Sequence, residues 1–156
     1  MILSKNLKKN NIILKAKSTN RWDLIEEMLD LAIKNNYVKK EYRDALKNSI
    51  FDREKSMSTG IGRGVAIPHC TTDDVEDIVI VLAFCEKGID FESIDSQPVQ
   101  IAIFLLVPKS KLKHHIKTLA NIAKMMNNEE LRQKLIHLKK PEAVLKTIKD
   151  FENISD

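Results

Sequence analysis

Histidine is the residue type with the clearest capacity for chemistry in this sequence, and it occurs at four positions: His69, His114, His115 and His137. The ordinary pKa of an imidazole is about 6.5, so most rings are neutral at neutral pH, and the neutral ring is a nucleophile. His69 follows Pro68 at the end of a short apolar segment, and a polar segment with three of the four glycines precedes it. His137 lies in a polar helical stretch and is most simply a surface residue. His69 is therefore the candidate for covalent chemistry.

The polar segment before His69 contains groups that could bind a phosphoryl group carried on its ring. A doubly negative phosphoryl group needs N–H donors, hydroxyls or an arginine. The candidate donors are Arg53, Ser56, Ser58, Thr59 and the backbone of Gly60, Gly62 and Gly64. On these residues alone, the segment can be read as a phosphoryl-binding site or as a structural turn.

Several other kinds of site are disfavoured by the motifs. Residues 60–64 match neither G-x-x-x-x-G-K-[ST] nor G-x-G-x-x-G, and they precede a predicted strand instead of a helix, so a nucleotide-binding loop is not supported. The chain has no G-x-S-x-G, H-E-x-x-H or C-x-x-C motif, and we expect no cofactor. Its two cysteines, Cys70 and Cys85, do not make a disulfide framework, and both are expected to be free thiols.

Cys70 raises a rival chemistry because it stands next to His69. Together with His114 and His115, these two residues could be read as a zinc site. Adjacent residues rarely bind one tetrahedral ion, and successive residues on a helix face different ways. We therefore expect no metal site.

The composition is that of an ordinary globular protein, with 43% hydrophobic and 31% charged residues. At 156 residues, we expect a single domain spanning 1–156. The net charge of +4 does not predict nucleic-acid binding, because acidic residues accompany the lysines and the densest cluster, 109–113, lacks interleaved aromatics. No apolar run approaches the ~20 residues of a membrane span, and the N-terminus does not resemble a secretory signal. We expect a cytoplasmic protein that is not embedded in a membrane.

The spacing of apolar residues predicts an α/β protein. Continuous β-branched runs at 78–84 and 99–107 indicate strands covered on both faces, and shorter strands are expected at 10–16 and 65–67. Helical spacing predicts helices at 21–35, 39–52, 112–126, 129–138 and from Pro141 onward. Helices on both sides of a sheet rich in β-branched residues make an α/β layer architecture.

The predicted helix 112–126 places His115 near its N-terminal end. His115 and Leu119 are one turn apart and share the inner stripe, where Leu112 is also expected. His114 is offset by about 100° around the helix and should point elsewhere. A helix N-terminus carries partial positive charge and suits a phosphoryl group. His115 is therefore a second candidate for the site.

Two separated motifs in the chain match a known family. The segment 53–69 reads REKSMSTGIGRGVAIPH. It closely resembles the signature of the fructose/mannitol-type enzyme IIA domains of the bacterial phosphoenolpyruvate-dependent phosphotransferase system. Residues 107–108 and 115–123 resemble the second landmark of the family. The likeness covers nearly the whole chain, and two motifs in the right order make it specific.

The resemblance implies roles for four residues. His69 matches the histidine that receives a phosphoryl group from the histidine-containing phosphocarrier protein, and His115 matches a second histidine that stabilises that group. Arg53 matches an arginine near the active-site loop, and Thr59 falls at the hydroxyl-bearing position before the glycines. The implied fold is a mixed β-sheet flanked by helices on both faces, the phosphotransferase/anion-transport-like fold.

Cys70 departs from the family pattern, which usually has a small residue, most often glycine, after the phosphorylated histidine. If this position requires a positive φ, cysteine costs about 1 kcal/mol. If it does not, the thiol narrows the pocket. A redox-sensitive thiol would need a lowered pKa. The roles of Cys70 and Ser58 in the site stay open.

The T-G-I-G-x-G-V-A-I-P-H form of the signature is more like the stand-alone nitrogen-regulatory branch than the mannitol branch. In that branch, phosphorylation controls binding to target proteins. The alternative is a sugar-specific enzyme IIA that feeds a separate enzyme IIB/IIC permease. A third interpretation, a non-catalytic binding module, is supported only by Cys70. The expected partners are therefore the phosphocarrier protein and either enzyme IIB or regulatory targets.

Overall fold

The computed structural model describes residues 3–155, with side chains through residue 153. Its helices are α1 (Leu3–Asn6), α2 (Arg21–Lys34), η1 (Lys40–Tyr42), α3 (Arg43–Ser56), η2 (Lys109–Lys111), α4 (Leu112–Met126), α5 (Glu129–Ile136) and α6 (Pro141–Ser155). Its strands are β1 (Leu7–Ile13), β2 (Gly60–Gly62), β3 (Val65–Ala66), β4 (His69–Thr72), β5 (Val79–Ile89) and β6 (Val99–Pro108). Within these residues, no helix is long and apolar enough to span a membrane.

Within the described residues, six strands form one mixed sheet in the order β1-β5-β6-β3-β2, and β4 also pairs with β6. The central strands β5 and β6 are antiparallel, and β1 runs parallel to β5. Both β3 and β4 run parallel to β6, and β2 closes an antiparallel hairpin with β3. The mixed sheet implied by the family resemblance is confirmed.

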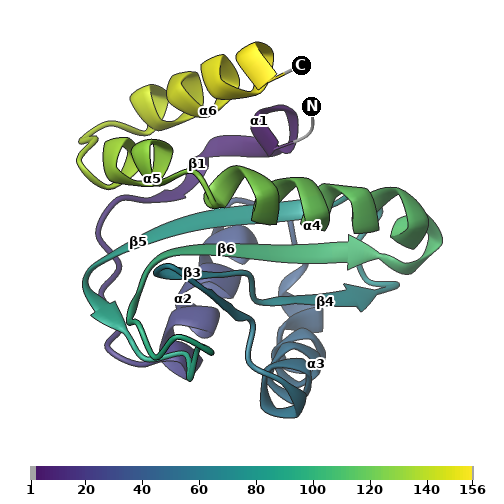
Figure 1. Cartoon of the computed structure of the whole chain (residues 1–156). Helices are drawn as coiled ribbons and strands as arrows, with labels where there is room; N and C mark the ends of the chain where they lie inside the picture. The colour runs from purple at the N-terminus through teal and green to yellow at the C-terminus, as the bar shows by residue number, and fades with distance from the viewer. Residues whose placement is uncertain (1–2, 156) are drawn as a thin grey trace.

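Helices cover both faces of the sheet (Figure 1). On one face, called the α3 face below, α2 and α3 bury Leu24, Leu46 and Ile50. On the other, called the α4 face, the buried helical side chains are Ile122, Leu131, Leu135, Val144 and Ile148. Since β5 and β6 are covered on both sides, their sequences are continuous apolar runs with little alternation.

Pro68 separates two strands that pair with the same edge of β6. Residues 65–66 pair with 101–102, whereas His69 pairs with Leu105. Proline has no N–H to donate to a ladder, so the strand is interrupted there. The Pro68 carbonyl still accepts a hydrogen bond from the Leu105 N–H at 3.0 Å. His69 therefore begins a new strand, whereas the sequence suggested that it follows the end of the preceding one.

Most helix boundaries agree with the apolar spacing. The predicted helix 112–126 is α4, and α6 begins at Pro141 as expected. The Asn20 side chain caps α2 by accepting a hydrogen bond from the Asp23 N–H at 2.9 Å. The helix predicted to end near residue 52 continues to Ser56, which places Arg53 on α3.

Candidate active site

The ring of His69 is half-buried at the first position of β4. Its Nδ1 lies 2.8 Å from the Ile67 carbonyl oxygen. A carbonyl oxygen only accepts, so Nδ1 carries the proton and Nε2 keeps its lone pair. Burial lowers the pKa of His69 below its ordinary value and Arg53 lowers it further, whereas the Ile67 carbonyl and Glu54 raise it. The ring is therefore neutral near pH 7 and has a free nucleophilic nitrogen.

His69 and Cys70 lie on opposite faces of the sheet. Residues that pair across neighbouring strands share a face, and successive residues alternate. His69 pairs with Leu105, which belongs to the core on the α4 face. Cys70 pairs with Leu106, and both belong to the core on the α3 face. The two adjacent side chains therefore point away from each other.

Cys70 lies outside the site, so the expectation that its thiol narrows the pocket is wrong. Cys70 is 6% exposed, and burial raises the pKa of its thiol to about 12. A thiol with so high a pKa is unreactive near neutral pH. Cysteine costs no strain here, because the described non-glycine residues with positive φ are Asn36, Arg63, Glu92 and Ser96. Among residues 3–155, no group of three or more His, Cys, Asp or Glu could hold a metal ion.

Replacing Cys70 with alanine should destabilise the fold without changing the expected phosphorylation of His69. The lost sulfur leaves a small cavity in a packed core, so the free energy of unfolding should fall by about 1–2 kcal/mol, measured by urea unfolding. The labelling rate should stay within about twofold. Cys85→Ala is the matched control, because Cys85 is buried in the same core with its pKa also raised to about 12. A much slower rate for Cys70→Ala alone would place the thiol at the site.

His115 lies in the first turn of α4, on the same face of the sheet as His69. It is 4% exposed, its Nδ1 lies 3.4 Å from Thr118 Oγ1, and the exposed His114 ring packs edge-on against it. Burial lowers the pKa of His115, and the neighbouring His114 and Lys111 lower it further, so the ring is neutral near pH 7. In the described part of the chain, no hydrogen bond joins the rings of His69 and His115. The structure places them on one side of the sheet.

Arg53 lies in the last turn of α3, and its positive charge lowers the pKa of His69. Its Nη1 donates a hydrogen bond to the Met57 carbonyl at 2.8 Å. An arginine has five N–H donors, so this bond leaves others available for an anion. Arg53 is thus a cation held near the ring by a bond to its own helix end.

The hydroxyls of Ser58 and Thr59 are already engaged within the protein. Ser58 Oγ donates to the Phe91 carbonyl and accepts from the Gly60 N–H at 3.0 Å. Thr59 is 4% exposed, and both its N–H, at 2.9 Å, and its hydroxyl donate to the Glu54 carboxylate. In this arrangement the two side chains hold the segment in place and direct no free hydroxyl proton toward a phosphoryl group.

The glycine-rich segment forms a hairpin of the antiparallel strands β2 and β3. Gly62 precedes its turn and Gly64 lies in the turn, with φ values of 92° and 79°, which favour glycine. The Arg63 N–H between them donates to Asp95 Oδ2 at 2.7 Å. The backbone groups of Gly60, Gly62 and Gly64 were expected to bind phosphate, and of these the Gly60 N–H already donates to Ser58 Oγ. For Gly62 and Gly64 the expectation stays a prediction.

The carboxylate that organises this hairpin was not predicted from the sequence. Glu54 is 1% exposed and lies 3.5 Å from an Arg21 nitrogen. In the sequence it stands in the charged run 52–55, which reads as the solvent-facing part of a helix. The one available signal was its place inside the matched signature, next to Arg53.

The chain matches a known family along nearly its whole length. Residues 5–151 match the family model "Phosphoenolpyruvate-dependent sugar phosphotransferase system, EIIA 2". The chain belongs to this family. As an EIIA 2 member, it is 38% identical over 109 residues to a nitrogen regulatory protein of Escherichia coli, covering 69% of this chain and 67% of that protein. It is 32% identical over 120 residues to a fructose-specific EIIA component of Haloferax volcanii, covering 77% of each.

This EIIA 2 chain is also similar to a longer relative and to two solved structures. It is 30% identical over 152 residues to a fructose-specific EIIABC component of Bacillus subtilis. This match covers 97% of the chain but only 24% of that relative's length. The structure of nitrogen regulatory protein IIA-Ntr from Neisseria meningitidis has a TM-score of 0.85 at 25% identity, covering 94% of this chain and 99% of that one. Mannitol IIA from E. coli shares the fold, with a TM-score of 0.76 at 24% identity over 90% of this chain and 97% of that one. The predicted family and fold class are confirmed.

Proposed function

We propose that His69 accepts a phosphoryl group on Nε2 from a histidine-containing phosphocarrier protein in the cytoplasm. The chain then passes the group on, or its phosphorylation state regulates a target protein. The observation that carries this proposal is the hydrogen bond from His69 Nδ1 to the Ile67 carbonyl at 2.8 Å. This bond fixes the proton on one nitrogen and leaves the lone pair of the other on a half-exposed ring.

The transfer is a displacement at phosphorus. The lone pair of His69 Nε2 forms a new P–N bond, the P–N bond to the carrier's histidine breaks, and its electron pair stays on the carrier's imidazole nitrogen. The proton on His69 Nδ1 remains hydrogen-bonded to the Ile67 carbonyl, so the phosphorylated ring carries a positive charge. Transfer to the next acceptor follows the same course in the opposite sense.

Arg53 and His115 are the proposed stabilisers of the phosphoryl group. The positive charge of Arg53 acts at the ring of His69, where it attracts the phosphoryl dianion. His115 lies in the N-terminal turn of a fifteen-residue helix, where the partial positive charge favours anions. A neutral His115 ring also offers one N–H donor on the α4 face, the face that His69 shares.

Exposed apolar side chains on the elements beside His69 support docking of a partner protein. Met57, directly after α3, is 70% exposed, and Leu112 and Ile116 in the first turns of α4 are 40% and 54% exposed. The expectation that Leu112 faces inward is therefore wrong. Large apolar side chains left in solvent next to a reactive group are suited to contact with another protein.

The proposal is tested by incubating the chain with a phosphocarrier protein loaded with radiolabelled phosphate. We expect acid-labile label, located by peptide mapping on the peptide that contains His69. Label that appears on His115 or His137 instead, or no label at all, would contradict the proposal.

We favour the regulatory role for this chain. It is supported by the similarity to nitrogen regulatory proteins, including the structure with a TM-score of 0.85. The second candidate, a sugar-specific enzyme IIA, is supported by the fructose-specific relatives, one of which matches 97% of this chain. A solved complex of mannitol enzyme IIA with phosphorylated enzyme IIB from E. coli shares the fold. Adding a separate enzyme IIB to the labelled chain discriminates the two, because only the sugar-specific role predicts rapid loss of label.

A further inference from the structure

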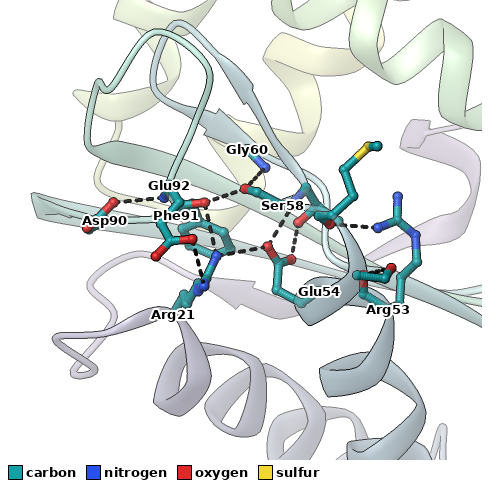
Figure 2. A network of polar contacts seen from close by, with 11 residues as sticks. Arg21, Arg53, Glu54, Ser58, Gly60, Asp90, Phe91 and Glu92 are labelled. Carbon is teal, nitrogen blue, oxygen red and sulfur yellow. Dashed lines mark hydrogen bonds and ion pairs between the residues drawn. The ribbon is translucent and has the colours of Figure 1, made fainter.

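A buried carboxylate lies beneath the glycine hairpin (Figure 2). The side chain of Glu54 is 0% exposed and accepts hydrogen bonds from the N–H of Thr59 at 2.9 Å and from its hydroxyl. Its charge partner is Arg21 of α2, with Nη1 3.5 Å away. Burying a charge is costly unless it is paired and hydrogen-bonded. The phosphoryl chemistry described above does not use this group.

A continuous series of hydrogen bonds connects Glu54 with the ring of His69. The Thr59 N–H donates to Glu54, and the Thr59 carbonyl accepts from the Ile67 N–H at 3.0 Å. The Ile67 carbonyl then accepts from His69 Nδ1 at 2.8 Å. The Ile67 carbonyl selects the tautomer and the direction of the His69 ring. Glu54 holds this carbonyl in place through the backbone hydrogen bond between Ile67 and Thr59.

Arg21 extends the network to the segment 90–97. Its Nη1 donates to the Phe91 carbonyl at 3.2 Å, and its Nη2 lies 3.4 Å from a Glu92 oxygen. Ser58 donates to the same Phe91 carbonyl from the hairpin side. Figure 2 shows these groups meeting between the two segments. Arg21 thus balances the charge of Glu54 and holds a second segment against the hairpin.

We propose that Glu54, balanced by Arg21, is a positioning residue for His69: it holds Thr59 and the hairpin so that the Ile67 carbonyl presents the ring for transfer. This inference rests on the proposed function. The carboxylate also acts through its charge, which raises the pKa of His69.

The charged groups that act on His69 both come from α3. Arg53 lowers the pKa of His69 and Glu54 raises it. The paired strand β6 presents Leu105 there, and His115 on α4 is neutral near pH 7 because its pKa is lowered. Removing the charge of Glu54 leaves Arg53 unopposed, so the pKa of His69 falls further. The neutral ring is the nucleophile, so the phosphorylation rate falls at low pH, where the ring becomes protonated. This part of the pH profile, the acid limb, moves to lower pH when the pKa of His69 falls.

Glu54→Gln removes the charge and keeps the shape and one acceptor oxygen. Phosphorylation of His69 is measured with phosphoramidate, a small donor that needs no carrier protein, from about pH 5 to about pH 9. The ring of His69 is titrated in parallel by NMR. We expect the plateau rate to fall about 10-fold, and the acid limb and the NMR midpoint to move to lower pH. A folded Glu54→Gln variant with an unchanged plateau and midpoint overturns the proposal.

Glu152→Gln is the matched control. Glu152 is another buried carboxylate, 4% exposed, and it accepts from the N–H groups of Leu3 and Ser4 at 3.1 and 3.2 Å. This variant should lose stability and keep both the plateau rate and the acid limb. If it changes the pH profile as Glu54→Gln does, the effect is general destabilisation and the inference fails.

Thr59→Val provides a second test that leaves the charge of Glu54 in place. It removes the hydroxyl that donates to Glu54 and keeps the backbone bond. We expect the rate to fall about 3-fold and the acid limb to stay in place. In the double variant with Glu54→Gln, the rate loss should be smaller than the product of the two single losses. If Glu54→Gln does not fold, an unchanged rate in Thr59→Val overturns the inference. Wild type that is labelled at His69 by phosphoramidate but never by the phosphocarrier refutes the proposed function alone.

Discussion

Replacing His69 with glutamine should abolish phosphoryl transfer from the carrier protein, with a rate loss of more than about 1000-fold. Glutamine is a neutral polar side chain of similar size, and its amide nitrogen takes the place of Nε2. Its amide nitrogen has no available lone pair, so no P–N bond can form. Because His69 is only half-buried, the free energy of unfolding should change by less than about 1 kcal/mol. Transfer of radiolabel and thermal unfolding measure the two effects separately.

His137→Gln is the control for this substitution. His137 is exposed, and its Nδ1 lies 2.6 Å from the Gln133 carbonyl, so it shows the same tautomer with a free Nε2. We expect full labelling of His137→Gln, because a free lone pair without nearby Arg53 and His115 is not a site. A His69→Gln variant that still takes label would refute the assignment of His69.

Gly60→Ala should destabilise the hairpin strongly for a purely steric reason. A Cβ added at Gly60 would collide with Ser93 Oγ and lie 3.1 Å from the Cβ of Phe91. Among the described glycines, those with positive φ are Gly62, Gly64 and Gly88, so alanine at residue 60 meets a clash and no backbone strain. We expect the free energy of unfolding to fall by about 1–3 kcal/mol, measured by urea unfolding. Labelling of His69 should slow as well, since the hairpin holds Ile67.

Ser93→Ala should rescue Gly60→Ala. Ser93 Oγ is the atom that the new methyl group meets, and among the described residues it is a buried oxygen without a hydrogen-bond partner. Removing it alone should be neutral or slightly stabilising, because an unsatisfied buried hydroxyl is lost. The double variant should recover most of the stability. If both single effects simply add, the clash between these two residues is not the cause.

The long elements of the fold could be predicted because each has a strong local signal. Helix α4 has apolar residues at helical spacing over its whole length, and Pro141 marks the start of α6. The exposure of Leu112 could not be predicted. An apolar residue at helical spacing has the same pattern whether it packs on the core or remains in solvent for a partner.

The part of the candidate site that depends on tertiary packing was beyond the sequence. His69 and His115 were predicted from their motifs, but the face of the sheet on which Cys70 lies follows from its pairing with Leu106. The burial of Glu54 likewise depends on Arg21, which is 33 positions away in the chain. A charged residue in a charged run is normally solvated, and only the contact between α2 and α3 reverses that expectation.

The two ends of the described chain lie side by side, because Glu152 on α6 accepts hydrogen bonds from the backbone of Leu3 and Ser4 (Figure 1). Both ends pack near β1, at the opposite edge of the sheet from β3 and β2, and β4 with His69 lies along the far side of β6. A polypeptide fused at either end would leave the molecule away from the reactive ring. The same architecture can therefore stand alone or form one module of a longer chain without covering the ring of His69.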